Sequence, residues 1–187
     1  MALKTFVKVS NVTNLSDARY CAGMEVDMLG FACVTGKSHF VPVSQFQDIR
    51  GWIIGPAIVA EIEGIEEEEV SSIIENYKPD YLQVNYQLAQ KITNDLPLII
   101  RFEPSINWET LNNRKINFCI LTAEQFQQHK EIIPASIALI VEHIKDDSLS
   151  IFVEEKIGIA LSGSDEISPG LKDFDSLANI LEQLEVE

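Results

Sequence analysis

The sequence predicts an α/β protein in which short strands alternate with helices, and three observations indicate it. Eight short apolar runs, many of them rich in β-branched residues, recur at residues 6–9, 28–33, 57–60, 81–84, 98–102, 118–121, 137–141 and 157–161. These runs are apolar almost throughout, as is typical of parallel strands covered on both faces. Stretches with helix-like features lie between them. Such alternation favours repeated βαβ units.

The intervening helices are predicted from periodicity and from residues typical of helix ends. The first of them begins at the cap candidate Asn14 and closes on Gly23. The acidic run at residues 66–69 is typical of a first helical turn, where the helix dipole favours carboxylates. The predicted helices cover residues 14–23, 44–50, 66–77, 86–94, 108–113, 124–133, 147–153 and 174–184.

Eight strand–helix repeats can close into a (β/α)8 TIM barrel. Such barrels typically contain about 250 residues, with about 200 near the lower end. At 187 residues the chain is therefore expected to be a small barrel with shortened helices and loops, forming a single domain over residues 1–187. An open, doubly wound sheet is the alternative.

Composition and charge exclude several classes of protein. Hydrophobic residues make up 46% of the chain and charged residues 23%, which is typical of a globular protein and excludes wholesale disorder. The formal charge of −15 disfavours nucleic acid and anionic membranes as partners. The absence of a signal-like start or of an apolar run long enough to span a bilayer favours a cytoplasmic location. Cys21, Cys33 and Cys119 are widely spaced and are expected to be reduced thiols.

In a barrel of this kind, function is expected at the carboxyl ends of the strands. The residues that follow the predicted strands are 10–11, 34–36, Glu61, Asn85, Glu103, Thr122, 142–143 and 162–164. They include three carboxylates, with Lys37 as the evident cation of this region. The Gly/Ser loop after the eighth strand stands where barrels often bind phosphate. A tight turn that requires glycine explains this loop equally well.

Several motifs occur in a fixed order near the two ends of the chain. They are KVSNVTNLSDA at residues 8–18, DMLGF at 27–31, KSHFV at 37–41, LQVN at 82–85 and SGSDEISPGLKD at 162–173. Together they resemble the phosphoribosylanthranilate isomerase family, whose opening motif is Lys-Ile-Cys-Gly-Ile-Thr followed by an Asp-Ala pair. Residues 104–155 match that family poorly.

The resemblance implies a (β/α)8 barrel that performs an Amadori rearrangement of an aminoaldose phosphate in tryptophan biosynthesis. Such an enzyme is an isomerase of the aldose–ketose (intramolecular oxidoreductase) type, and we expect no cofactor and no metal. The family's catalytic positions, a general-base cysteine and a general-acid aspartate, correspond here to Ser10 and Thr122. An aliphatic hydroxyl has a pKa far above the range that suits proton transfer near neutral pH. A serine also needs a neighbouring base, and the sequence identifies none. We therefore expect neither residue to be competent.

The resemblance also implies a site for a small ligand, phosphorylated or not. The expected binding residues are Asn11, His39, Gln83, Asn85, Ser162, Gly163 and Ser164. Two replacements weaken the expected phosphate site. His39 stands where the family has a phosphate-binding arginine, and Glu142–His143 replaces a glycine pair. The long glycine-rich loop after the sixth strand is missing.

Four residues are candidate replacement groups: Cys33, Glu103, Glu142 and His143. Cys33 could supply the missing thiol, although buried packing is the competing interpretation. The mouth glutamates and His143 could serve as acid–base groups or hold a divalent cation, or they could simply face water. Three functions stay open: an isomerase-like protein with impaired or altered catalysis, a non-catalytic barrel (a pseudoenzyme) that binds a small ligand or partner at an acidic mouth, and a different isomerase or lyase. The sequence does not indicate an oligomeric state.

Overall fold

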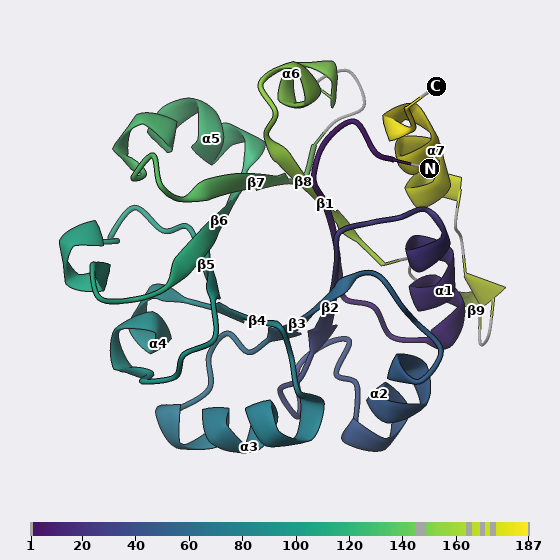
Figure 1. The fold of residues 1–187 in the computed structure, drawn as a ribbon, viewed down its shortest axis with the longest axis horizontal. Coiled ribbons are helices and arrows are strands. Elements are labelled where there is room, and N and C mark those ends of the chain that lie inside the picture. The colour runs from purple at the N-terminus through teal and green to yellow at the C-terminus, as the bar shows by residue number, and fades with distance from the viewer. Residues whose placement is uncertain (1, 145–148, 164–165, 169–170, 173–174, 187) are drawn as a thin grey trace.

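The protein is a closed barrel of eight parallel strands surrounded by helices (Figure 1). The computed structural model describes residues 2–144, 149–163, 166–168, 171–172 and 175–186. The strands pair in chain order and β8 pairs with β1, so the predicted (β/α)8 barrel is confirmed and the open sheet is wrong. The barrel strands are β1 (Val7–Ser10), β2 (Met28–Ala32), β3 (Ala57–Glu61), β4 (Tyr81–Val84), β5 (Leu98–Arg101), β6 (Ile116–Thr122), β7 (Ala138–Glu142) and β8 (Gly158–Ser162).

Short helices follow six of the first seven strands, in keeping with the short chain. They are α1 (Leu15–Gly23), α2 (Val43–Arg50), α3 (Glu67–Tyr77), α4 (Tyr86–Lys91), α5 (Ala123–His129) with the 3-10 turn η2 (Lys130–Ile132), and α6 (Leu149–Glu154). The helix predicted at residues 108–113 is instead the 3-10 turn η1 (Trp108–Leu111). After β8 an unpredicted pair of short strands, β9 (Glu166–Ser168) and β10 (Leu171–Lys172), precedes α7 (Asp175–Leu184).

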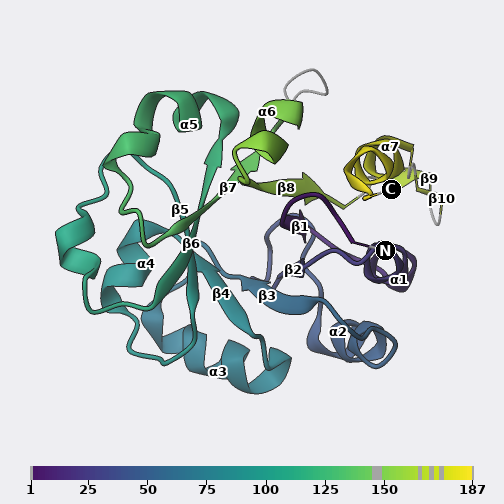
Figure 2. The same ribbon diagram turned by 45° about the horizontal axis from the view of Figure 1, so that its top comes forward.

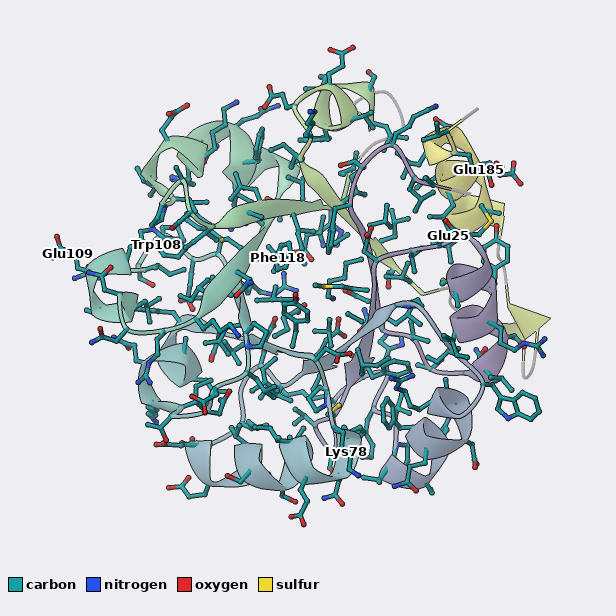
Figure 3. All side chains as sticks on the ribbon, in the orientation of Figure 1. Glu25, Lys78, Trp108, Glu109, Phe118 and Glu185 are labelled. Atoms are coloured by element: carbon teal, nitrogen blue, oxygen red, sulfur yellow. The ribbon has the colours of Figure 1, made fainter. Side chains whose placement is uncertain are left out.

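Alternation along each strand separates two hydrophobic layers. On β3, Ile58 and Ala60 pack outward with the helices, whereas Val59 packs inside the barrel. The inner layer is small and consists of Met28, Val59, Ile99, Ile120, Ile140 and Ala160. Towards the amino ends of the strands, Phe118 stacks on Phe6 with ring centroids 5.0 Å apart. Figure 3 shows Phe118 inside the ring of strands and Trp108 outside it.

Side-chain caps fix where several helices begin. The side chains of Asn14 and Asn85 accept hydrogen bonds from backbone N–H groups in the first turns of α1 and α4. Thr122 forms a full capping box with Gln125 at the start of α5. These caps place the carboxyl ends of β4 and β6 directly against the helices that follow, so the loops at these points are short.

The two ends of the described chain lie side by side near α1 and α7, as Figures 1 and 2 both show. Leu3 bridges Glu185, and the backbone N–H of Lys4 donates to the carbonyl of Leu184 over 2.7 Å. The last helix therefore closes the ring of helices next to the first. Among the described helices, none has the length and apolar character needed to cross a membrane.

Candidate functional site

A cavity of about 500 Å³ opens at the carboxyl ends of the strands, where the sequence predicts function. Most of its lining residues are polar or charged. They are Ser10, Asn11, Ala32, Val34, Lys37, Glu61, Glu63, Gln83, Arg101, Glu142, His143, Ile144, Ala160, Leu161 and Ser162. Two groups of charged side chains contribute to this lining: Glu61, which is paired with the fully buried Lys8, and Arg101 with Glu63 and Glu142.

The first group, the lysine cluster, consists of Lys8, Ser10 and Glu61 at the floor of the cavity. The Lys8 ammonium lies 2.5 Å from Glu61 Oε1 and also donates to the Ser10 hydroxyl. The Lys8 side chain is fully buried. Burial works to raise the pKa of Glu61, but the Lys8 charge, with hydrogen bonds from Lys8, Ser10 and the Asn11 backbone, outweighs it and holds that pKa below its usual value. The cluster is therefore a matched ion pair.

Gly30 on β2 provides the space that the lysine cluster occupies. A Cβ atom at this position would overlap the Glu61 carboxylate and lie 2.9 Å from Lys8 Nζ. Because real Cβ atoms do not approach other atoms so closely, any other residue would displace the ion pair. The packing of the Lys8 and Glu61 side chains, and not an unusual backbone conformation, therefore explains the glycine in the DMLGF motif.

The second group, the arginine cluster, consists of Arg101, Glu63 and Glu142 at the cavity wall. Arg101 Nε lies 2.9 Å and 3.0 Å from the two oxygens of Glu63, and Arg101 Nη1 donates to Glu142. Burial works to lower the pKa of Arg101, but the two carboxylates outweigh it and raise that pKa above its usual value. One cation is shared by two carboxylates, so the arginine cluster carries a net negative charge.

Gln83 lines the cavity and contacts the arginine cluster through Glu63. Its amide nitrogen donates to Glu63 Oε1 over 2.8 Å, and the residue is only 3% exposed. Its Oε1 atom is buried without a hydrogen-bond partner. A buried acceptor without a donor is costly, so Gln83 is one point in this cavity where the described protein leaves a polar group unsatisfied.

The structure places the two family catalytic positions in different surroundings. Ser10 lines the cavity, but its hydroxyl is held between Lys8 and Glu61. Thr122 is not among the lining residues, and its hydroxyl accepts a hydrogen bond from the Gln125 backbone over 3.1 Å as the cap of α5. The two hydroxyls are therefore not a facing pair across the cavity.

The Gly/Ser loop after β8 contributes only part of what was predicted for it. Asn11 and Ser162 both line the cavity, and Asn11 Nδ2 donates to Ser162 Oγ over 3.3 Å. The Gly163 N–H donates to the Ser10 carbonyl over 2.7 Å, and a Cβ on Gly163 would lie 2.9 Å from the Asn11 carbonyl oxygen. Gly163 thus closes β8 against β1 and its N–H is already used. Ser164 lies outside the described residues.

Several other predicted site residues lie away from the cavity lining. His39 is exposed, and Asn85 caps α4. Glu103 accepts hydrogen bonds from the Tyr86 backbone and Ser105. Cys33 packs with the outer hydrophobic layer, where burial raises the pKa of its thiol. Of the candidate replacement groups, only Glu142 and His143 line the cavity.

The expectation that Lys37 is the evident cation of the mouth is incomplete, because Arg101 also lines the cavity and the buried Lys8 pairs with the lining residue Glu61. Likewise Glu61 and Glu142 do not simply face water but form ion pairs. Strand parity could have found these residues: Lys8 precedes Ser10 by two positions and therefore shares its face. No group of three metal-ligating side chains suited to a metal ion occurs within the part of the chain that the structure describes.

Fold and cavity together define the protein as a small (β/α)8 barrel with a polar, ion-paired mouth. Its fold is that of the phosphoribosylanthranilate isomerases. The enzyme from Thermus thermophilus superimposes with a TM-score of 0.78 at 17% identity, over 96% of this chain and 98% of that one. The enzyme from Pyrococcus furiosus gives a TM-score of 0.71 at 16% identity, over 96% and 98%.

Another phosphoribosylanthranilate isomerase, solved with reduced 1-(o-carboxyphenylamino)-1-deoxyribulose 5-phosphate bound, gives a TM-score of 0.73 at 18% identity. That alignment covers 95% of this chain and 97% of the other. The chain matches no protein-family model and no curated protein. At these identities the likeness establishes the fold, and the chemistry has to be argued from the cavity.

Proposed function

We propose that this chain is a phosphoribosylanthranilate isomerase-like barrel whose mouth binds a small ligand and whose isomerase chemistry is impaired. The observation that carries the proposal is the use of the two family catalytic positions for other purposes. Thr122 caps a helix, and Ser10 is held within an ion pair. The motif order at both chain ends and the likeness of fold over nearly the whole chain support descent from such an isomerase.

Proton transfer is the first requirement that the cavity fails to meet. The rearrangement needs a general base and a general acid with pKa values near the working pH. Ser10 accepts a hydrogen bond from Lys8 Nζ and is also hydrogen-bonded to Glu61, the ion-pair partner of Lys8. Lys8 acts as a hydrogen-bond donor to the serine, and the pKa of Glu61 is held below its usual value, which makes that carboxylate a weak base. Neither neighbour therefore suits the activation of Ser10.

Recognition of a phosphate is the second requirement. Glu142 stands where the resemblance implies a glycine pair, and it is turned into the cavity towards Arg101. The N–H of Gly163 is occupied by Ser10, and His39 is exposed away from the lining. A phosphate dianion would thus meet carboxylates where it needs donors.

The second candidate is an isomerase or lyase with altered chemistry, and the pair Glu142–His143 is the observation in its favour. Glu142 is 16% exposed and His143 79% exposed, with Oε1 and Nε2 3.8 Å apart. Both line the cavity, and together they offer a carboxylate and an imidazole for proton transfer. The Cys33 version of this candidate lacks support, because that thiol is buried in the outer layer.

Turnover of N-(5-phosphoribosyl)anthranilate generated in situ tests the proposal. We expect the anthranilate fluorescence to decay with the purified protein no faster than in a blank. A phosphoribosylanthranilate isomerase such as the Thermus thermophilus enzyme, assayed in parallel, is the positive control. Clear turnover by the wild-type protein that Ser10→Ala or Thr122→Ala abolishes would contradict the proposal. Turnover that only Glu142→Gln or His143→Ala abolishes would favour the second candidate.

A further inference from the structure

We propose that two copies of this chain pair through their amino-end faces, each placing its α2–β3 loop in a hollow of the other. The amino-end face is formed by the segments that lead into the eight strands, and the α2–β3 loop is the segment 51–56. This face lies at the opposite end of the barrel from the mouth, so the inference goes beyond the proposed function and does not depend on it. Exposed apolar side chains, their places around the ring and the charge of this face carry it.

The amino-end face carries most of the exposed large apolar side chains. Of the five such residues among those that the structure describes, three lie at this face: Trp52 (70% exposed), Ile54 (93%) and Ile132 (55%). Trp52 and Ile54 both belong to the α2–β3 loop, where Gly55 with a φ of +114° permits the turn into β3. Burying these side chains against a partner would remove apolar surface from water.

A hollow in the same face has a matching apolar character. Its volume is about 790 Å³, and it lies around the start of β6, β7 and β8. Phe118, stacked on Phe6, forms part of its wall. Five aliphatic side chains also line it: Ile132, Ile133, Ile137, Leu139 and Ile157. Such a hollow suits a large apolar side chain presented by another molecule.

The loop and the hollow lie at opposite edges of the amino-end face. The loop leads into β3 and the hollow is centred on β7, and these strands are four places apart in a closed ring of eight (Figure 1). A twofold axis across the face, perpendicular to the line that joins the two features, therefore brings each loop onto the hollow of the other copy. This contact is self-complementary and closes at two copies. Both mouths then point away from the interface.

The amino-end face is electrically neutral, although the whole chain carries a formal charge of −15. Its segments are residues 2–6, 24–27, 51–56, 78–80, 92–97, 112–115, 130–137 and 155–157. Six acidic side chains, Glu25, Asp27, Asp80, Asp95, Glu131 and Glu155, are balanced by six basic ones, Lys4, Lys78, Arg114, Lys115, Lys130 and Lys156. The excess negative charge therefore lies elsewhere on the molecule, and two copies repel each other least when they meet at this face.

Sedimentation velocity of the full chain at about 1–100 μM tests the inference. We expect a species of about 42 kDa, twice the 21.0 kDa of one chain. Ile54→Asp changes the loop and Ile132→Asp changes the hollow. We expect each to raise the dissociation constant of the dimer at least about hundredfold, because the symmetry places two carboxylates in the interface. Ile151→Asp is the matched control, since Ile151 is 51% exposed on α6, and should leave the dimer unchanged.

Cross-linking tests which parts of the two copies meet. The three native cysteines are buried, so a thiol introduced at the surface reacts selectively with a short bis-maleimide. We expect cross-linked dimers from an equimolar mixture of Ile54→Cys and Ile132→Cys chains after exchange of subunits. Ile54→Cys alone should give few, because the two loops lie at opposite edges of the interface.

A species of 21.0 kDa at every concentration would overturn the inference, as would a dimer that neither Ile54→Asp nor Ile132→Asp weakens. Equal weakening by Ile151→Asp would also overturn it, since the effect would then not belong to this face. Cross-linking of Ile54→Cys alone as efficient as that of the mixture would contradict the reciprocal arrangement. The proposed function fails on a different result, which is turnover in the anthranilate fluorescence assay.

Discussion

The lysine cluster and the arginine cluster lie in one barrel mouth but differ in charge balance and exposure. In the lysine cluster a fully buried cation meets one carboxylate whose side chain is 10% exposed. In the arginine cluster a cation that is 37% exposed is shared by two carboxylates. Burial of charge is tolerated only when the partner is present, so the lysine cluster behaves as part of the core. The arginine cluster has one carboxylate more than it has cations, and its side chains are more exposed to solvent.

The strongest test of this comparison removes the buried cation. Lys8→Met leaves Glu61 buried without its partner, and we expect the free energy of unfolding to fall by about 3–5 kcal/mol. Urea denaturation followed by circular dichroism measures it. The double variant Lys8→Met/Glu61→Leu should recover much of the loss, because an apolar pair of similar volume can replace a buried ion pair. If the double variant is as unstable as the single one, the loss comes from packing and not from charge.

Gly30→Ala tests whether the lysine cluster needs the space beside β2. The new Cβ would overlap the Glu61 carboxylate, and we expect a loss of about 1–3 kcal/mol, as is typical of overpacking. Gly23→Ala, at the end of α1, is the matched control, because nothing lies within 4 Å of its added Cβ. Thermal denaturation of both variants measures the difference. Equal melting temperatures would show that the ion pair can move aside freely.

Arg101→Met makes the equivalent change in the arginine cluster. Because this side chain is 37% exposed, we expect water to screen the two carboxylates left behind and the loss of stability to stay below about 1 kcal/mol. The same urea titration as for Lys8→Met measures it. A loss as large as that of Lys8→Met would erase the distinction between the two clusters.

The pH dependence of stability tests the ion pair of the lysine cluster. The folded-state pKa of Glu61 lies below its usual value, so the unfolded chain binds more protons in acid. This contribution to stability is fully present above the ordinary glutamate pKa of about 4.3 and is lost as the pH falls through the folded value. We expect Glu61→Gln to flatten the decline of stability below about pH 4.3, and Glu68→Gln to leave it in place. Parallel acid titration curves for Glu61→Gln and the wild-type protein would contradict the assignment.

The barrel could be predicted because its signal is spread over the whole chain. Eight apolar runs and the helix signals between them each report a local property, and eight such repeats favour a (β/α)8 barrel over the open sheet. The helix predicted over residues 108–113 is the shorter 3-10 turn η1, which ends at Leu111 where Asn112 and Asn113 follow. The strands β9 and β10 are too short for an alternation of polar and apolar residues to indicate them in the sequence.

The site was predicted less completely, because its main contacts join residues far apart in the chain. Ser10, Asn11, Gln83 and Ser162, which the resemblance implies as site residues, line the cavity. Lys8 pairs with Glu61 from β1 to β3 and Arg101 with Glu142 from β5 to β7, so both pairings join strands that are next but one to each other in the barrel. Parity along a strand gives the face of a residue, but not the partner that it meets. Thr122 is the opposite case, because its contact is local. The Thr-x-x-Gln pattern of Thr122 and Gln125 is a capping-box signature that the sequence itself contains.

The central claim is that the charges of this mouth serve one another and not a phosphorylated ligand. Calorimetric titration with ribose 5-phosphate, comparing the wild-type protein with Glu63→Gln/Glu142→Gln, tests it most directly. We expect no saturable binding to the wild-type protein and measurable binding to the variant, in which Arg101 is released from its carboxylate partners. Binding to the wild-type protein as tight as to the variant would contradict the account.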